Sequence, residues 1–138
     1  MAASNSQVIH RMFDEVINAG RLELVDELFA PEFVSHTAQG DMNRDAFREF
    51  VRGWRAGFSD IHCEVSQLIS EGDHVSWTVR ATGTHDGPFN GIPATGKPVD
   101  FLSMNHGVLR DGQGVEHWLL LDMLTMLTQL GVIPAPGA

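Results

Sequence analysis

The chain has 138 residues, of which 43% are hydrophobic and 20% charged, so it suits one domain with its own core and argues against disorder. Eighteen acidic residues against nine basic ones give a formal charge of -9, which disfavours nucleic acid and anionic membrane surfaces as partners. The single cysteine excludes an internal disulfide, and no apolar stretch has the roughly 20 residues of a transmembrane helix. With no signal peptide visible, we expect a cytoplasmic domain over 1–138, with 136–138 as a tail.

The first third of the sequence has the apolar spacing of helices. A first helix is expected to begin near Ser4 and to end at Gly20. Its apolar residues, at helical intervals, are Val8, Met12, Val16 and Ile17. A short second helix is expected over 22–29, because Pro31 stops it, and an extended segment follows over 32–36.

The third expected helix follows a polar loop around Gly40 and is the most strongly amphipathic. Its apolar residues recur at i, i+3, i+4, i+7 and i+11, while arginines occupy its other faces. The apolar set is Phe47, Phe50, Val51, Trp54 and Phe58. This pattern predicts a helix packed over a core.

After Phe58 the apolar period changes from 3.6 to 2, which indicates strands. Alternation over 61–66 and 75–82, with a turn at 71–73 between them, is typical of half-buried antiparallel strands. Helices followed by a run of antiparallel strands predict an α+β fold, with the helices on one face of a curved sheet.

The last third continues this pattern. The segment 85–98 is rich in glycine and proline and is expected to be an ordered loop. Two more strands are expected at 99–110 and 115–121, joined by a tight turn. A final amphipathic helix is expected after Asp122, which serves as its N-cap, and ends at Gly131.

Three stretches, in the right order, resemble the SnoaL-like polyketide cyclases. Residues 83–97, GTHDGPFNGIPATGK, resemble the family's G-T-H-x-G-x-F-x-G-I-P-x-T-G-K signature. Residues 111–118, with the Gln-Leu-Gly at 129–131, are similar to its D-G-K-I-x-E-H-W … Q-L-G pattern, and 31–36 to its P-x-F-V-x-H. The resemblance implies an NTF2-like α+β cone, with helices packed on a strongly curved, mainly antiparallel sheet. It also implies a homodimer and a pocket inside the cone.

The resemblance also carries catalytic positions. In characterised cyclases of this family an Asp just after the His-Trp pair is the general acid/base of an aldol ring closure, without metal or organic cofactor. That position is Leu119 here. An assisting His corresponds to Asn105, or to His106 if the strand aligns one residue further, and a pocket Asn corresponds to Ser35. Because a leucine cannot move a proton, the chain has the family's scaffold without its best-known catalytic group.

Strand alternation indicates which residues replace that group. If Leu119 faces the pocket, His117 and Leu121 share its face, and Asn105 faces the pocket from the preceding strand. His117 is then the candidate acid/base near pH 7, and Asn105 and Ser35 are expected to orient a carbonyl oxygen. Apolar surroundings disfavour the charged imidazole, so His117 is expected to serve as a base. The alternative is a buried neutral histidine that only bonds a neighbouring strand.

The remaining candidates are expected to contact the substrate. The apolar pocket wall suits a flat hydrophobic ligand, and His36 is expected near the pocket mouth, where its alternative role is to bond the loop. The expected substrate-binding residues are His36, Trp77, Trp54, Phe50, Leu119, Leu121 and Phe89. No HxH or HExxH spacing supports a metal, and no GxGxxG, P-loop or GxSxG motif supports a nucleotide cofactor or serine hydrolysis.

These observations leave three possible functions, of which two are enzymatic and one is not. The first is a cofactor-independent polyketide cyclase, or a related lyase or isomerase, acting on a hydrophobic carbonyl-bearing molecule. The second is a non-catalytic small-molecule-binding protein, and the third is a fold relative with epoxide-opening or hydroxylation chemistry. Epoxide opening lacks support, since Arg80 and Arg110 have no matching inward carboxylates. A homodimer through the outer sheet face is expected, because Leu102, Met104 and Val108 make that face apolar.

Overall fold

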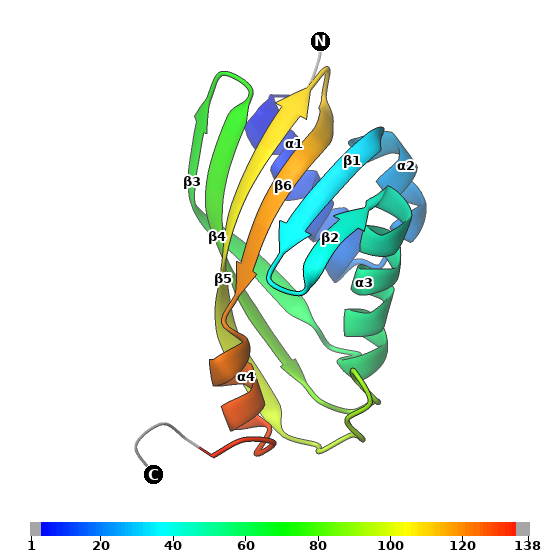
Figure 1. Ribbon diagram of the computed structural model, residues 1–138, viewed down its shortest axis with the longest axis vertical. Helices are drawn as coiled ribbons and strands as arrows, with labels where there is room; N and C mark the ends of the chain where they lie inside the picture. The colour runs from blue at the N-terminus through cyan, green and yellow to red at the C-terminus, as the bar shows by residue number, and fades with distance from the viewer. Residues whose placement is uncertain (1–3, 135–138) are drawn as a thin grey trace.

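The computed structural model describes residues 4–134, in which helices pack on a single curved sheet (Figure 1). The elements in chain order are α1 (Asn5–Arg11), η1 (Met12–Asn18), η2 (Leu22–Leu24), α2 (Val25–Leu28), β1 (Phe29–Thr37), β2 (Gly40–Asn43), α3 (Arg44–Gly57), β3 (His62–Glu71), β4 (His74–Thr84), β5 (Pro98–Arg110), β6 (Gln113–Leu121) and α4 (Met123–Gln129). The tail expected at 136–138 lies outside the described residues. Within 4–134, no helix has the length and hydrophobicity needed to span a bilayer.

In the part of the chain that the structure describes, the sheet has six strands in the order β2-β1-β6-β5-β4-β3. Neighbouring strands are antiparallel except for β1 and β6, which run parallel and join the N-terminal hairpin to the rest of the sheet. The sheet is open, with β2 and β3 at its edges. The expected α+β cone with a mainly antiparallel sheet is therefore confirmed.

Three local expectations are wrong. The second helix ends at Leu28 and not at Phe29, because Phe29 is extended and is the first residue of β1. Pro31, expected only to stop the helix, lies within β1, where the register with β6 shifts between Phe29 and Val34. The polar loop expected around Gly40 is instead part of a hairpin, because Gly40–Asn43 forms strand β2 and Gly40 pairs with Thr37 of β1.

The first helix changes type midway. After α1, which begins with a capping box at Ser4, the chain continues as a π-helical segment, η1. There the N–H of Ala19 donates to the carbonyl of Asp14, five residues earlier, at 3.1 Å. Short π-helical segments are frequent at functional sites.

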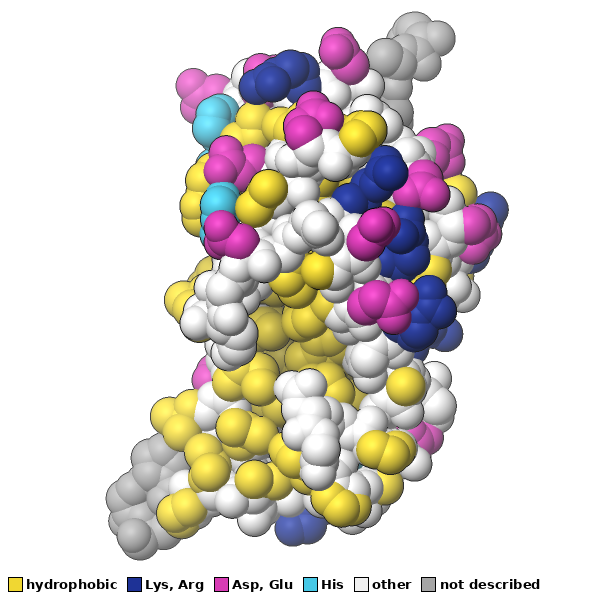
Figure 2. Space-filling view, turned by 45° about the vertical axis from the view of Figure 1, so that its right-hand side comes forward, with side chains coloured by type: hydrophobic (Ala, Val, Ile, Leu, Met, Phe, Trp, Pro, Cys, Tyr) yellow, Lys and Arg dark blue, Asp and Glu magenta, His cyan; other side chains and the backbone are white. Residues whose placement is uncertain are grey.

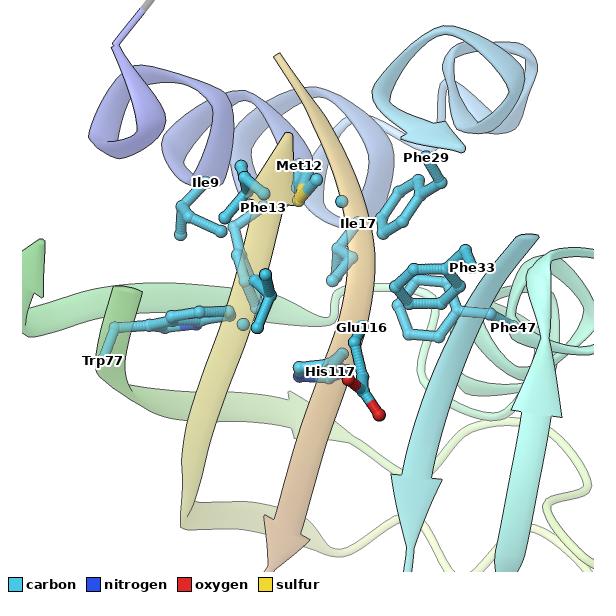
Figure 3. A pocket seen from close by; sticks show the side chains of 14 residues that line it. Ile9, Met12, Phe13, Ile17, Phe29, Phe33, Phe47, Trp77, Glu116 and His117 are labelled. Carbon is cyan, nitrogen blue, oxygen red and sulfur yellow. The ribbon is translucent and has the colours of Figure 1, made fainter. Parts of the chain in front are cut away.

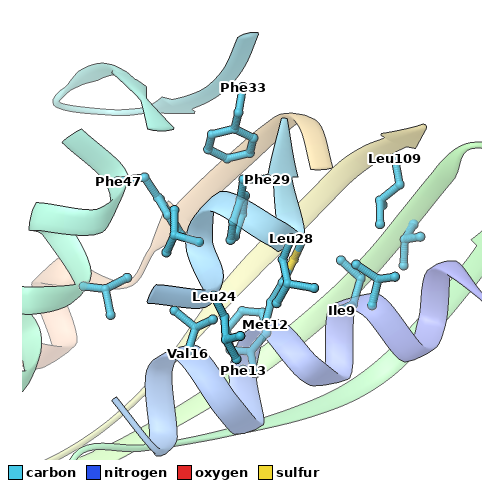
Figure 4. Packing of buried hydrophobic residues seen from close by; sticks show 14 of the residues in the cluster. Ile9, Met12, Phe13, Val16, Leu24, Leu28, Phe29, Phe33, Phe47 and Leu109 are labelled. Atoms are coloured by element: carbon cyan, nitrogen blue, oxygen red, sulfur yellow. The ribbon is translucent and has the colours of Figure 1, made fainter. Parts of the chain in front are cut away.

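The amphipathic faces pack as expected. On α3 the buried side chains are Phe47, Val51 and Trp54, and Phe47 contacts the rings of Phe29 and Phe33 at centroid distances of 5.1 and 5.5 Å (Figure 4). A second core cluster joins the C-terminal end of α3 to strands β4 and β5 and to α4, which packs on β5. Its fully buried or nearly buried residues include Trp54, Phe58, Phe101, Met126 and Leu130. Asp122 caps α4 as expected, because its carboxylate accepts the Thr125 N–H at 3.1 Å.

The loop between β4 and β5 is tied down at both ends. The His85 N–H donates to the Lys97 carbonyl at 2.9 Å, and the Gly96 N–H donates to the His85 carbonyl at 2.8 Å. The Thr95 N–H donates to the His85 ring at 3.2 Å. At the loop's tip, Phe89 is buried, with its ring centroid 4.4 Å from that of Trp54. The loop is therefore an ordered wall against α3.

Candidate active site

The inner face of the sheet encloses two adjoining cavities beneath η1 and α3. Both are lined by Phe13, Ile17, Phe47 and His117, so His117 lies where the cavities meet. Figure 3 shows the side chains around the first cavity. The lining of both is almost wholly apolar, and the three polar residues of the second cavity are Ser103, Asn105 and His117.

The second cavity leads outward to a vestibule. The two share Phe50, Trp54 and Leu121, and the vestibule is bounded by the hairpin residues 37–42 and by Phe89. Figure 2 shows a hollow lined by hydrophobic side chains on this side of the molecule. A small molecule therefore has a route from the surface to His117 through a partly polar vestibule and then an apolar cavity.

Four neutral polar side chains form a hydrogen-bonded row across three strands. Ser35 on β1 lies 2.8 Å from His117 Nδ1, and His117 Nε2 lies 2.9 Å from the Asn105 side-chain oxygen. The Asn105 amide nitrogen in turn donates to Ser103 Oγ at 3.0 Å. The row forms because parallel pairing sets Ser35 beside His117, while antiparallel pairing sets His117 beside Gly107, two residues from Asn105.

Burial sets the charge of this histidine. His117 is 8% exposed, and burial lowers its pKa to about 4, helped by the charges of His36 and His106. Within residues 4–134, no carboxylate is hydrogen-bonded to the ring to offset that burial, and both ring nitrogens face neutral partners. His117 is therefore neutral at pH 7.

Aromatic rings hold the imidazole in place. Trp77 stacks on His117 with centroids 5.7 Å apart and planes 9° apart, and Phe33 stacks at 6.4 Å and 22°. Phe47 meets the ring edge-on at 6.1 Å. The imidazole is thus fixed by packing as well as by its two hydrogen bonds.

Another reactive side chain in the cavity wall, a cysteine, is not ionised at neutral pH. Cys63 lines the second cavity, and burial raises the pKa of its thiol to about 12, so it stays protonated. Within residues 4–134, no group of three or more His, Cys, Asp or Glu side chains is arranged to hold a metal ion.

The structure brings most of the predicted site residues together. Ser35, Asn105 and His117 form the row described above, with Ser35 fully buried behind His117. The apolar candidates also surround the cavities or the vestibule: Trp77 lines the first cavity, Phe50, Trp54, Leu119 and Leu121 line the second, and Phe89 lines the vestibule.

His36 is the exception, since it does not lie at the cavity. It follows Ser35 on β1, and adjacent strand residues face opposite sides of the sheet. Its ring lies on the outer face, where Nδ1 is 2.8 Å from an Asp41 oxygen and Nε2 is 2.7 Å from a Glu116 oxygen. These hydrogen bonds, to Glu116 first and then to Asp41, raise the pKa of His36.

The helical side of the site does not follow from the sequence motifs. Phe13, Ile17 and Phe47 line both cavities, yet helical spacing marks Ile17 and Phe47 only as core residues and does not single out Phe13. A signal is present, because Met12, Phe13, Val16 and Ile17 make an apolar face wider than one helical stripe.

Comparison with known proteins agrees with this geometry. The structure of IdmH from Streptomyces antibioticus, assigned as a polyketide cyclase, is 34% identical over 94% of this chain and 99% of that one, with a TM-score of 0.83. A SnoaL-like polyketide cyclase structure from Jannaschia sp. CCS1 is 28% identical over 97% and 99% of the two chains, with a TM-score of 0.84. AclR from Streptomyces galilaeus, assigned as a hydroxylase, is 25% identical over 94% and 82%, with a TM-score of 0.85.

No curated protein matches the sequence. The sequence profile of the SnoaL-like polyketide cyclases, in contrast, matches residues 7–130, which is nearly the whole chain. The chain therefore belongs to the SnoaL-like polyketide cyclase family, with its NTF2-like α+β cone fold.

Proposed function

We propose that this protein is a cofactor-independent cyclase, or a related lyase or isomerase, that moves a proton beside a carbonyl group of a hydrophobic small molecule. The observation that carries the proposal is His117, a neutral imidazole held between Ser35 and Asn105 at the junction of two apolar cavities. A neutral histidine in a dry, rigid site is suited to general acid/base chemistry.

The hydrogen-bonded row allows His117 to act in both directions. With Asn105 donating to Ser103, its side-chain oxygen accepts from His117 Nε2, so the imidazole lone pair is on Nδ1. If the Asn105 amide turns over, the row is satisfied in the opposite sense: Ser103 donates to Asn105, Asn105 to Nε2, and Nδ1–H to Ser35. Nε2 then carries the lone pair on the cavity side.

In ring closure, His117 acts first as a base and then as an acid. Nε2, released from Asn105, takes the proton from the carbon beside a carbonyl; the C–H electron pair moves into the enolate, and an N–H bond forms. The enolate carbon then attacks a second carbonyl of the same molecule, forming a C–C bond and an alkoxide. The imidazolium returns its proton to that alkoxide, so no net proton, electron or cofactor is consumed.

The cavity limits the substrate. The second cavity holds about 70 Å³ and the vestibule about 320 Å³. Sites for small molecules usually measure about 300 to 1,000 Å³. A polyketide-type substrate would therefore place one apolar ring beside His117 and extend through the vestibule.

Deuterium exchange tests the proposal without knowledge of the natural substrate. 2-Tetralone, a two-ring ketone, is dissolved in D₂O with the protein, and loss of its C1 proton signal is followed by NMR. The wild type is expected to accelerate exchange above the buffer rate, and His117→Ala is expected to abolish that acceleration. Equal rates in the two proteins would refute the assignment of His117.

A second function is favoured by Leu119. An apolar residue lines the second cavity at the position that carries the family's catalytic Asp, which suits a protein that binds ligands without converting them. Binding of 2-tetralone with no acceleration of exchange by the wild type would favour this function over the first.

We also propose a cytoplasmic homodimer. The outer sheet face exposes large apolar side chains in its centre: Leu102 at 48%, Met104 at 57%, Trp118 at 41% and Leu120 at 64% exposure. Because a patch of this kind is unusual on a monomer, a second copy of the chain is its proposed cover.

A further inference from the structure

The C-terminal end of η1 is held by an arginine on α3. Arg55 Nη1 donates to the carbonyl oxygen of Ile17 at 2.6 Å and to that of Asn18 at 3.0 Å. Ile17 and Asn18 are the last residues of η1, and the last carbonyls of a helix have no partner within the helix. Positive charge is also favourable at this end of a helix. The guanidinium therefore satisfies two groups that would otherwise need solvent.

Arg55 makes no competing ion pair. Arg52, about one turn earlier on α3, pairs with Glu49 at 3.3 Å, whereas Arg55 takes part in none of the ion pairs among residues 4–134. Gly20 leaves room for the guanidinium, because an added Cβ there would lie 2.7 Å from Arg55 Nε. The φ of Gly20, +75°, also favours glycine at this position. The half-buried Arg55 side chain is thus committed to the end of η1.

The held segment is the helical wall of both cavities. Phe13 and Ile17 are the η1 residues that line both, and Arg55 bonds the backbone of Ile17 itself (Figure 3). The next residue, Asn18, ties η1 to β3: its amide nitrogen donates to the Cys63 carbonyl at 2.8 Å, and its oxygen accepts the Cys63 N–H at 2.7 Å. Bonds to α3 and to β3 therefore meet where η1 covers the cavities.

We propose that Arg55 is a positioning residue, which holds Ile17 over the two cavities and so keeps water from the imidazole of His117. The inference goes beyond the proposed function, because a dry cavity serves a binding protein as well as an enzyme. Without the two Arg55 bonds, the end of η1 separates more easily from α3, and Ile17 moves with it. Water then reaches His117 and relieves burial, the largest cause of the lowered pKa of that histidine.

The other groups that act on His117 do not depend on Arg55. The remaining titratable residues of the two cavity walls, and the residues whose charges lower the pKa of the ring, are Glu116, Cys63, His36 and His106. Arg55 does not contribute to that pKa through its own charge. A change in the pKa of His117 after substitution of Arg55 therefore reports entry of water.

The pKa of His117, followed by NMR of its ring, tests the inference. Arg55→Met is expected to raise it from about 4 to about 5 or above, because water then solvates the imidazolium. Gly20→Ala displaces the same guanidinium while the charge stays in the protein, so it should raise the pKa as well. Arg52→Met is the matched control, since it removes a charge from the same helix but no bond to η1, and it should leave the pKa at about 4.

Amide hydrogen exchange locates the change within the fold. In Arg55→Met the amides of 17–19 should exchange about 10-fold faster or more than in the wild type, while the amides of the central strands keep their protection. A pKa of His117 that stays at about 4 in both Arg55→Met and Gly20→Ala would overturn the inference, as would an equal rise in Arg52→Met. The proposed function fails instead if the wild type does not accelerate exchange of 2-tetralone, whatever these pKa values are.

Discussion

His117 on the inner face and His36 on the outer face have the same side chain, lie on paired strands, and differ in almost every physical respect. His117 is buried between the neutral side chains of Ser35 and Asn105, and burial lowers its pKa to about 4. His36 lies at the surface between Glu116 and Asp41, whose hydrogen bonds raise its pKa. One sheet therefore holds a neutral histidine inside and favours a charged one outside.

The contrast shows that the two faces of the sheet give the same side chain different protonation states. The alternation of side chains along each strand decides which histidine faces the cavity. The hydrogen-bond partners on each face then set the protonation state of that histidine. The inner face keeps neutral hydrogen-bonding groups around His117, so nothing there stabilises a permanent charge on the ring. The following predictions test whether this difference between the faces is functional.

The largest effect is expected for alanine at the two histidines. His117→Ala should lower the protein-dependent exchange of 2-tetralone by about 100-fold or more, whereas His36→Ala should change it by less than about twofold, since only the former removes a positioned base. NMR exchange rates at pH 7 provide the measurement. A loss of similar size in both variants would mean that the outer network, and not the cavity base, controls the rate.

The two histidines should also give opposite dependences of stability on pH. Between pH 6.5 and about 4, the unfolded chain binds the His117 proton more tightly than the folded one, so the free energy of unfolding should fall as pH decreases, by up to about 3 kcal/mol. The raised pKa of His36 acts in the other sense, because its stabilisation is present below pH 6.5 and is lost as pH rises through its folded pKa.

Denaturant unfolding from pH 4 to 8.5 measures these slopes. His117→Gln should flatten the acid side of the profile relative to the wild type, and His36→Gln should flatten the side above pH 6.5. Parallel profiles for wild type and His117→Gln would contradict the neutral state assigned to the buried ring.

A smaller change is expected from restoring a carboxylate. Leu119→Asp places an acid/base on the cavity wall opposite Asn105 and should raise the exchange rate by about 10-fold. Burial of the carboxyl group should lower the free energy of unfolding by about 1–3 kcal/mol. Leu120→Asp is the matched control, since the same substitution one residue later faces outward. Equal rate increases in both would show that the effect is not specific to the cavity.

The smallest effect on exchange is expected from the outer patch. Leu120→Asp puts a charge in the proposed interface between two copies, so light scattering should show a shift from dimer towards monomer mass at micromolar concentration. Exchange of 2-tetralone should remain within about twofold of the wild-type rate, because the cavity lies on the other face. A monomeric wild type would rule out the dimer.

The sequence alone determined the class of fold and most of the inward-facing residues. The helical stripe of α3 and the alternation along β5 and β6 are local patterns, and they suffice to place Asn105, His117 and Leu119 on one face of the sheet. The capping role of Asp122 is equally local. The second helix ends one residue earlier than its apolar spacing predicts, because β1 begins at Phe29, a residue that still fits that spacing.

Only the tertiary structure decided what each side chain contacts. Ser35 and His117 are 82 residues apart and meet because β1 and β6 pair in parallel, a register that no short pattern encodes. The same pairing turned His36 outward to Glu116, and the packing of η1 and α3 brought Phe13, Ile17 and Phe47 to the cavity. The place of the Trp77 ring likewise depends on Gly107 in a neighbouring strand, which leaves the space that the ring occupies. Periodicity specifies which face a residue takes, whereas long-range pairing and packing specify its partners, and the partners set its charge and chemistry.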